Sequence, residues 1–277
     1  MIDLGLSEQL MYSTVRIETF LNTGGIGTGT GFFFRFKEQG DSYIPAIVTN
    51  KHVIDGGVRG RFILTEADEN GNPLNTEHLP IELDNFQQRW LYHPDPQIDL
   101  CIMPIAPILH LAELQGRKPF FISLDKSLIP TIENLDELRA IENIVMIGYP
   151  NGIWDRENNL PIMRRGITAT HPKFDYNGTP QLLIDAACFP GSSGSPVLIY
   201  DEGGYTDKKG NTYMGANRVI LLGILFAGPQ HTAQGDIRVV DIPITQREIV
   251  LSTIPNNLGY VIKSNKLLDF DELLPDQ

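Results

Sequence analysis

A serine set between glycines, just before an apolar run, is the feature of this sequence best suited to chemistry. It lies in Pro190-Gly191-Ser192-Ser193-Gly194-Ser195-Pro196, followed by Val197-Leu198-Ile199-Tyr200. Glycines let the backbone turn tightly and approach a ligand closely. Such a turn can direct two N–H groups to one point beside the hydroxyl of Ser193, as stabilisation of an oxyanion in acyl transfer requires. The same composition also fits an ordinary loop before a strand, so this segment alone leaves both interpretations open.

Two other segments carry the groups that a serine nucleophile needs. His52 follows the apolar run Ala46-Ile47-Val48-Thr49, and Asp99 immediately precedes Leu100-Cys101-Ile102-Met103. A serine hydroxyl is a weak nucleophile unless a base takes its proton, and the pKa of imidazole suits that task. The imidazole in turn needs a carboxylate that fixes its tautomer and stabilises its charged form. We therefore predict that His52, Asp99 and Ser193 form a catalytic triad.

Each of these residues also has a purely structural interpretation. His52 could be a core histidine at a strand end, and Asp99 could cap a strand; Asp95, close by, has the context of a turn residue. The five other histidines lie in polar or loop contexts without the spacing of metal ligands: His78, His93, His110, His171 and His231. We expect no metal site and no cofactor.

The motifs around the three residues resemble those of trypsin-like serine peptidases, and most of all the protease domain of the HtrA/Deg branch. Thr49-Asn50-Lys51-His52-Val53 is similar to the histidine motif, Ile98-Asp99-Leu100 to the aspartate motif, and the segment 185–196 to the nucleophile motif. The order histidine, aspartate, serine is that of the chymotrypsin-type triad. The glycine-rich Gly27-Thr28-Gly29-Thr30-Gly31-Phe32 and the last strand, Gly259-Tyr260-Val261-Ile262, extend the resemblance to roughly residues 12 to 270.

This resemblance implies an all-β fold of two six-stranded antiparallel β-barrels with the active site in the cleft between them, followed by a short C-terminal helix. Short apolar or alternating runs between Gly, Asn, Asp and Pro clusters agree with a β-rich chain. The expected division is an N-terminal barrel at 1–117 carrying His52 and Asp99, a connector at 118–140, and a C-terminal barrel at 141–277 carrying Ser193. After the second barrel we expect no PDZ domain, in which respect the chain would depart from full HtrA enzymes.

The resemblance also implies an oxyanion hole and a substrate pocket. The oxyanion donors would be the backbone N–H groups of Gly191 and Ser193. The pocket for P1, the substrate residue before the scissile bond, would have Ala187 and Cys188 at its base and Phe226, Ala227, Gly228 and Gly259 along its walls. No acidic residue falls at that base, so a neutral pocket for small or aliphatic P1 residues is expected; Asp185 would reach the pocket only if the register shifts.

The charge and composition limit the classes of partner that this protein could bind. The net charge is −12, with 20% charged and 42% hydrophobic residues, the balance of an ordinary globular protein. A binder of nucleic acid needs a basic face, so nucleic acid is excluded, as is an anionic membrane surface. We expect a protein or peptide substrate and allow for an activating protein partner. Segment 229–257 has the character of an insertion that could serve as a lid or exosite.

The N-terminus and the cysteines predict a cytoplasmic location. Residues 1–10 have neither the basic region nor the apolar core of a secretory signal. The chain has only two cysteines, Cys101 and Cys188, both in apolar contexts that favour buried free thiols over a disulfide.

The function predicted from the sequence is that of a serine endopeptidase which makes limited or partner-regulated cuts in proteins. The alternative is a catalytically silent binding or scaffold module that keeps the trypsin-like fold. A third reading, an esterase or other acyl hydrolase, is disfavoured by the triad order and by the absence of a G-x-S-x-G elbow.

Overall fold

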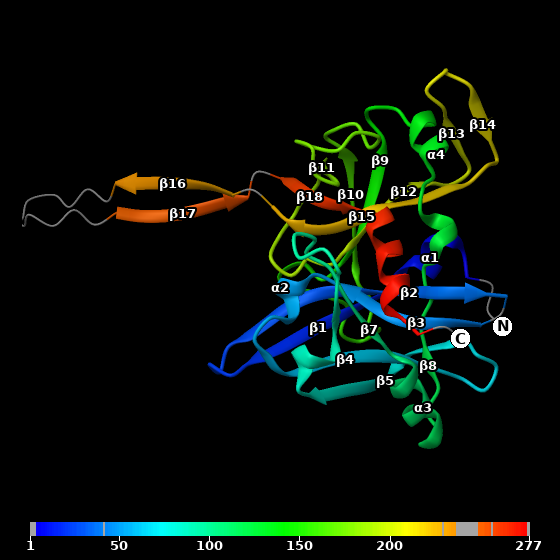
Figure 1. The fold of residues 1–277 in the computed structure, drawn as a ribbon, viewed down its shortest axis with the longest axis vertical. Coiled ribbons are helices and arrows are strands. Elements are labelled where there is room, and N and C mark those ends of the chain that lie inside the picture. Colours follow the sequence, from blue (N-terminus) through cyan, green and yellow to red (C-terminus); the bar gives the residue numbers. More distant parts are fainter. Residues whose placement is uncertain (1–3, 41, 229, 237–248, 256, 276–277) are drawn as a thin grey trace, which may run out of the picture.

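Two β units, joined along one side by helices, make up the body of the molecule (Figure 1). The structure is a computed structural model that describes residues 4–40, 42–228, 230–236, 249–255 and 257–275. Four short α-helices are present among these residues: α1 (Leu6–Met11), α2 (Lys51–Ile54), α3 (Ala106–Leu114) and α4 (Ile132–Glu137). Four 3₁₀ helices accompany them: η1 (Phe86–Arg89), η2 (Lys126–Leu128), η3 (Pro150–Gly152) and η4 (Ser264–Leu273).

The N-terminal unit is an eight-stranded antiparallel sheet with the order β5-β4-β1-β2-β3-β7-β6, in which β8 also pairs with β4. Its strands are β1 (Thr14–Leu21), β2 (Ile26–Gln39), β3 (Ser42–Thr49), β4 (Gly57–Ala67), β5 (Pro73–Asp84), β6 (Leu91–Tyr92), β7 (Cys101–Pro104) and β8 (Pro119–Phe120). The alternation of side chains in β2 sends Phe32 and Phe34 into one core and Phe33 into another, as the two-residue period of a strand dictates.

The C-terminal unit is a closed barrel of six strands in the order β10-β11-β18-β15-β12-β9. Its strands are β9 (Asn143–Gly148), β10 (Ile162–Thr168), β11 (Gln181–Asp185), β12 (Pro196–Asp201), β15 (Arg218–Ala227) and β18 (Leu258–Lys263). Two of them, β12 and β15, are continuous apolar runs, and they meet at the centre of the unit with Val197 facing Gly223. Because closure removes free sheet edges, this unit can present loops at its end without exposing unpaired backbone.

The predicted all-β class with a C-terminal helix is confirmed, but the N-terminal unit departs from the expected six-stranded barrel. Its described strands number eight, and their path ends at β5 and β6 without closing. Of its strands, β6 and β8 are only two residues long, and the pairing of β4 with β5 shifts register at Thr65/Glu66. Segment 118–140, the expected connector, contains β8, η2 and α4.

One apolar core runs through both units. It contains Phe32 and Val48 from the N-terminal sheet together with Ile147, Leu198 and Ile262 from the barrel, all buried. Burial of a side chain of this size contributes on the order of 1.5–3 kcal/mol. The two units are therefore held against each other by the same apolar contacts that stabilise each of them.

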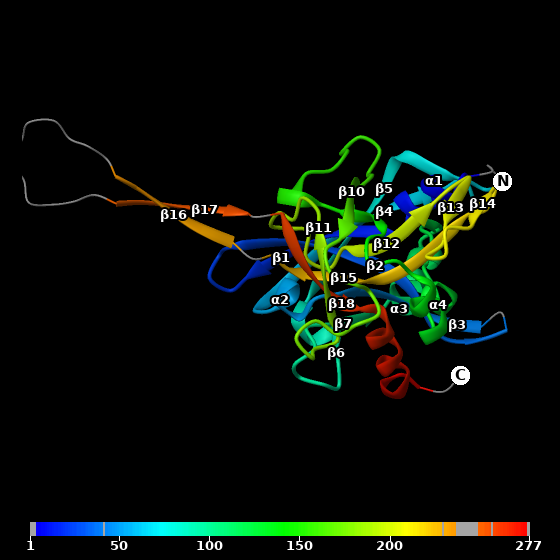
Figure 2. The ribbon, with the colours of Figure 1, turned by 90° about the horizontal axis from the view of Figure 1, so that it is seen from above.

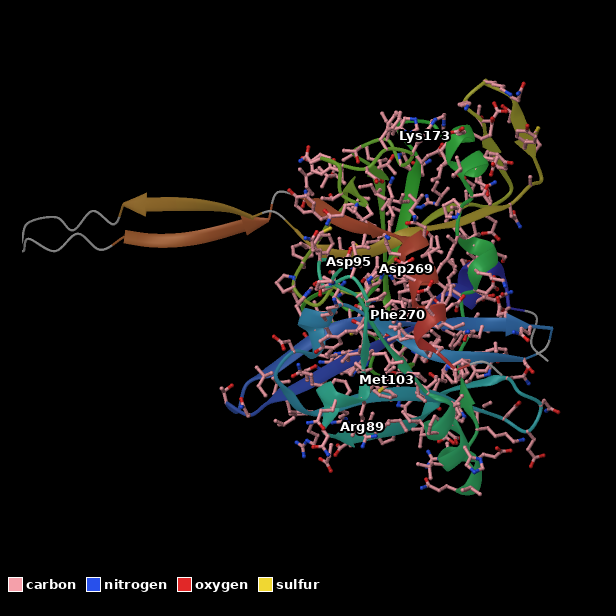
Figure 3. All side chains as sticks on the ribbon, viewed as in Figure 1. Arg89, Asp95, Met103, Lys173, Asp269 and Phe270 are labelled. Atoms are coloured by element: carbon pink, nitrogen blue, oxygen red, sulfur yellow. The ribbon has the colours of Figure 1, made fainter. Side chains whose placement is uncertain are left out.

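The C-terminal 3₁₀ helix η4 ties the two units together from outside (Figures 1 and 3). Phe270 is fully buried and its ring lies 6.0 Å from that of Phe36, while Asp269 contacts the Nε2 atom of His93 at 3.2 Å. The Nδ1 atom of His93 in turn accepts a hydrogen bond from the backbone N–H of Asp95 at 3.0 Å, in the loop that also carries Asp99. The helix thus supports the loop from which the candidate triad carboxylate comes.

Two additional hairpins project from the barrel. One consists of β13 (Gly204–Thr206) and β14 (Thr212–Met214), and the other of β16 (Gln230–Asp236) and β17 (Ile249–Pro255). The second hairpin leaves the barrel between β15 and β18 and extends away from both units in the two views (Figures 1 and 2). It occupies the segment expected to be an insertion at 229–257, of which residues 229, 237–248 and 256 lie outside the described residues.

The helices of the described residues are all too short or too polar to cross a membrane.

Candidate active site

The imidazole of His52 lies against the carboxylate of Asp99. His52 Nδ1 is 2.5 Å from Asp99 Oδ2, and the backbone N–H of His52 donates to Asp99 Oδ1 at 3.2 Å. The histidine side chain remains 48% exposed, so its other ring nitrogen is accessible. A carboxylate on Nδ1 places the proton there and leaves Nε2 free to accept one, which is the state that a general base requires.

The pairing of two strands, β3 and β7, positions both side chains. His52 sits in α2, directly after β3, and Asp99 lies just before β7, which pairs with β3 through Thr49 and Cys101. Asn50 fixes the two segments to each other, because its Nδ2 donates to the backbone oxygen of Asp99 at 2.8 Å. Asn50 is fully buried, so this hydrogen bond is shielded from water.

The loop that carries Ser193 has an unusual backbone at its two glycines. Gly191 has φ +84° and Gly194 has φ +87°, values that favour glycine. A Cβ atom at Gly191 would lie 2.6 Å from the carbonyl oxygen of Tyr149, and one at Gly194 would lie 1.9 Å from that of Thr30. The glycines around Ser193 are therefore required by both conformation and space, and the segment is no ordinary loop.

The peptide between Pro190 and Gly191 has a fixed orientation. The carbonyl oxygen of Pro190 accepts a hydrogen bond from the backbone N–H of Asn151 at 2.6 Å. Because the peptide is trans, the N–H of Gly191 points to the opposite side. Among the described residues, neither Gly191 N nor Ser193 N donates a hydrogen bond. Both donors that were expected to form the oxyanion hole are thus available to a ligand.

Thr30 joins this loop to the N-terminal sheet. Its backbone N–H donates to the carbonyl oxygen of Ser193 at 2.9 Å, and its hydroxyl donates to that of Gly191 at 2.9 Å. The same hydroxyl accepts from the backbone N–H of Tyr149 at 3.1 Å, and the backbone oxygen of Thr30 accepts from the hydroxyl of Thr49 at 2.7 Å. Thr30 thereby connects the nucleophile loop to the strand that leads into His52.

The hydroxyl of Ser193 makes a long hydrogen bond of 3.5 Å to the backbone oxygen of Phe226. Within the part of the chain that the structure describes, no hydrogen bond joins this hydroxyl to His52. Hydrogen bonds between catalytic groups are often long in the absence of substrate and tighten in the complex. The structure therefore brings His52 and Asp99 into direct contact and leaves Ser193 in a loop tied to the same elements.

The residues expected to form the P1 pocket meet at one end of the barrel. A Cβ atom at Gly259 would lie 2.6 Å from the Sγ atom of Cys188, and one at Gly228 would lie 3.6 Å from the Cβ atom of Cys188. Phe226 is adjacent through Ser193, and Ala227 pairs with the neighbour of Gly259, Tyr260, across β15 and β18. Burial raises the pKa of the Cys188 thiol to about 11, so Cys188 is a neutral group at neutral pH.

Comparison with known sequences settles the family. The family model of the trypsin-like peptidase domain matches residues 29–204, a region that includes His52, Asp99 and Ser193. The chain belongs to the trypsin-like peptidase family. The chain carries a trypsin-like peptidase domain, and the resemblance to this family stated from the motifs is confirmed. No match was found among curated proteins.

Several solved structures of serine proteases are similar to this trypsin-like peptidase, at low sequence identity and with TM-scores below 0.5. The active form of the Rv3671c protease from M. tuberculosis is 15% identical, with a TM-score of 0.43, over 93% of this chain and 78% of that one. The HtrA-type protease AlgW with a tripeptide is 15% identical, with a TM-score of 0.49, over 95% of this chain and 61% of that one. The serine endoprotease from Yersinia pestis is 15% identical, with a TM-score of 0.48, over 99% of this chain and 67% of that one.

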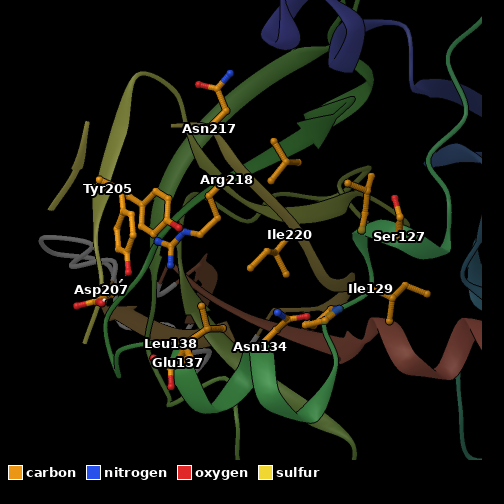
Figure 4. Close-up of a pocket in the computed structure, with 14 residues that line it drawn as sticks. Ser127, Ile129, Asn134, Glu137, Leu138, Tyr205, Asp207, Asn217, Arg218 and Ile220 are labelled. Atoms are coloured by element: carbon orange, nitrogen blue, oxygen red, sulfur yellow. Dashed lines mark hydrogen bonds between the residues drawn. The ribbon is translucent and has the colours of Figure 1, made fainter. Parts of the chain in front are cut away.

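A separate cavity of about 450 Å³ lies on the outside of the barrel of this peptidase (Figure 4). Arg218 and Tyr205 line it, but the guanidinium of Arg218 is already paired with Asp201 and Glu142, each at 2.7 Å. None of the residues predicted from the motifs lines this cavity. The charge of Arg218 is therefore already balanced by two carboxylates.

Sequence reasoning missed three residues that shape the site: Thr30, Asn151 and Arg164. Thr30 and Asn151 orient the loop of Ser193, as described above. Arg164 donates from Nη1 to the backbone oxygen of Ala187 and, at 3.0 Å, to the hydroxyl of Ser192. The alternating glycines around Thr30 were a signal of close approach, whereas nothing near Arg164 in the sequence marks it as a pocket residue. The neutral pocket base expected from Ala187 and Cys188 therefore has a cation behind it.

Proposed function

We propose that the protein is a serine endopeptidase that hydrolyses peptide bonds in protein substrates through His52, Asp99 and Ser193. The observation that carries the proposal is the contact of 2.5 Å between His52 Nδ1 and Asp99 Oδ2, made in a chain whose nucleophile loop leaves the N–H groups of Gly191 and Ser193 unengaged. A structural histidine at a strand end would need neither a carboxylate on one ring nitrogen nor exposure of the other.

The mechanism follows from the chemistry of these groups. His52 Nε2 takes the proton of Ser193 as its Oγ attacks the carbonyl carbon of the substrate, and Asp99 stabilises the resulting imidazolium. The N–H groups of Gly191 and Ser193 stabilise the oxyanion of the tetrahedral intermediate. His52 then gives the proton to the leaving amine, which releases the C-terminal fragment. Water, deprotonated by His52, hydrolyses the acyl-enzyme and restores Ser193.

Limited proteolysis and control by an activating protein partner remain predictions within this function. The orientation of the Pro190–Gly191 peptide supports an oxyanion loop that is in place without a partner, since Asn151 of the same chain holds it. A partner would raise activity only through a higher affinity for the active arrangement of Ser193 and His52.

A catalytically silent binding module is the second candidate. It is favoured by one observation, the hydrogen bond of Ser193 Oγ to Phe226 O in place of one to His52. In such a module the hydroxyl would keep that bond when a peptide occupies the pocket, and no acyl-enzyme would form.

Incubation with unfolded casein tests the proposal against both alternatives. We expect peptide-bond cleavage into a small set of discrete fragments, read by mass spectrometry, with no requirement for added metal or cofactor. Binding of casein without any cleavage would support the silent module. Hydrolysis of small esters with intact casein would point to an acyl hydrolase and would contradict the proposal.

A further inference from the structure

His93 is a buried histidine that the proposed mechanism does not use. It begins the loop that leads from β6 to Asp99, and its side chain has no exposed surface. Burial of an imidazole is unfavourable unless its polar atoms are hydrogen-bonded, so an apolar residue would fill this space at a lower cost in desolvation. The contacts of the two ring nitrogens therefore indicate why a histidine is present.

The Nδ1 atom of His93 holds the loop that carries Asp99. The backbone N–H of Asp95 donates to Nδ1 at 3.0 Å. The carbonyl oxygen of Asp95 in turn accepts from the backbone N–H of Ile98 at 3.2 Å. The backbone N–H of His93 donates to the carbonyl oxygen of Leu100 at 3.0 Å. Through these bonds His93 fixes the chain immediately before and immediately after Asp99.

The Nε2 atom of His93 is anchored on helix η4. A backbone N–H can only donate, so Nδ1 is the acceptor and the ring proton lies on Nε2. Nε2 is 3.2 Å from the carbonyl oxygen of Lys266 and 3.2 Å from Asp269 Oδ2. The ring also packs edge-on against Phe270, with the ring centroids 5.2 Å apart. These contacts fix both the orientation of the ring and its tautomer.

The segment before Asp99 has few other attachments. Residues 94–97 are exposed, whereas Ile98 is buried. Among the described residues, the hydrogen bonds that join 94–97 to other elements come from η4 through His93 and from Lys51 in α2. Lys51 Nζ donates to the carbonyl oxygens of Asp95 and Pro96 at 3.3 and 3.5 Å. A lysine is a flexible, strongly hydrated contact, so the buried ring of His93 is the more rigid of the two.

We propose that His93 is a positioning residue for catalysis, which holds Asp99 against His52 by joining the aspartate loop to helix η4. This inference rests on the proposed function, because it concerns the carboxylate of the same triad. The distance of 2.5 Å between His52 Nδ1 and Asp99 Oδ2 leaves little room for movement of the carboxylate. A displacement of about 1 Å in a catalytic group can lower a rate by about 100-fold.

The test replaces His93 with leucine, which fills the space of the ring and has no hydrogen-bonding group. We expect His93→Leu to lower kcat for a peptide substrate by about 10- to 100-fold. KM should stay nearly unchanged, because the loop contributes no residue to the predicted P1 pocket. Phe270→Leu is the matched control, since it loosens the packing of the same helix and leaves the hydrogen bonds of His93 in place. It should lower the unfolding temperature and keep kcat.

A double variant distinguishes positioning of Asp99 from a general structural effect. If His93 acts through Asp99, His93→Leu should lower kcat no further in the Asp99→Asn background, whereas independent effects would multiply. The residual hydrolysis of an activated ester measures both backgrounds. Loss of kcat by the same factor in the two backgrounds overturns the inference.

Asp269→Leu keeps the inference testable if His93→Leu does not fold. The side chain of Asp269 is 38% exposed, and its removal takes away one of the two acceptors of His93 Nε2. We expect kcat to fall by about 3- to 10-fold. Lys266→Met removes the ammonium that lies 3.0 Å from Asp269 Oδ2 and leaves His93 bonded, so its kcat should match that of the wild type. Equal kcat values for Asp269→Leu and Lys266→Met overturn the inference.

The outcomes also separate this inference from the proposed function. Wild-type protein that hydrolyses peptides, with a His93→Leu variant of equal kcat, overturns the inference and leaves the endopeptidase function intact. Wild-type protein that hydrolyses no peptide overturns both.

Discussion

Replacement of Asp99 with asparagine is expected to lower kcat for peptide hydrolysis by about 10⁴-fold while leaving KM nearly unchanged. The carboxylate of Asp99 accepts a hydrogen bond from His52 Nδ1 at 2.5 Å. An asparagine amide in the same place donates its N–H to Nδ1, so the ring proton moves to Nε2 and the imidazole can no longer take the proton of Ser193. Steady-state kinetics on a peptide substrate measure the loss.

Asp95→Asn is the matched control for this prediction. Asp95 lies in the same loop, but among the described residues its carboxylate accepts only from the backbone N–H of Gln97 and makes no hydrogen bond with His52. We expect its kcat to stay within a few-fold of the wild-type value. Both variants should unfold at a temperature close to that of the wild type. If Asp99→Asn were as active as Asp95→Asn, Asp99 would have no role in catalysis.

The second large effect is expected for Gly191→Ala, which should reduce kcat by about 10²- to 10³-fold, the loss that follows removal of one oxyanion donor. Gly191 has φ +84°, and the added Cβ would lie 2.6 Å from the carbonyl oxygen of Tyr149. The chain can relieve this contact only by rotating the Pro190–Gly191 peptide, which breaks its hydrogen bond to Asn151 and turns the N–H away. Single-turnover kinetics with an activated ester isolate the acylation step.

Gly178→Ala separates the loss of the oxyanion donor from the general cost of a side chain at positive φ. Gly178 has φ +74° in a surface turn, and an added Cβ would meet nothing within 4 Å. We expect this variant to lose about 1–2 kcal/mol of stability through backbone strain and to keep its kcat. The account of the oxyanion loop is wrong if Gly191→Ala and Gly178→Ala have the same kinetic effect.

The sequence was sufficient to predict the parts of the site that are local. Each triad residue, His52, Asp99 or Ser193, lies in a short motif, and the residues on either side of it indicate a strand end or a tight turn. The β-rich class also followed from local patterns, because two-residue alternation and turn residues are visible within a few positions. The contact of His52 with Asp99 then depends on the pairing of β3 with β7 and on the hydrogen bond of Asn50, a residue of the histidine motif, to the backbone of Asp99.

The remaining features depend on contacts between distant segments. Thr30 hydrogen-bonds to Gly191 across 161 positions, and Arg164 in β10 hydrogen-bonds to Ser192 across 28 positions. No periodicity or motif in the sequence predicts these long-range hydrogen bonds, because they follow from the way in which the strands and the two β units pack. For the same reason the sequence did not reveal that the path of the N-terminal sheet ends at β5 and β6 without closing.

The most direct test of the account is labelling of the folded protein with a fluorophosphonate probe at neutral pH, with Ser193→Ala beside the wild type. The probe reacts only with a serine whose hydroxyl is activated by a base and whose oxyanion hole is formed. The account predicts a single adduct, located by mass spectrometry on Ser193 and absent from Ser193→Ala. A folded wild-type protein without label, or with its label on Ser192 or Ser195, would contradict it.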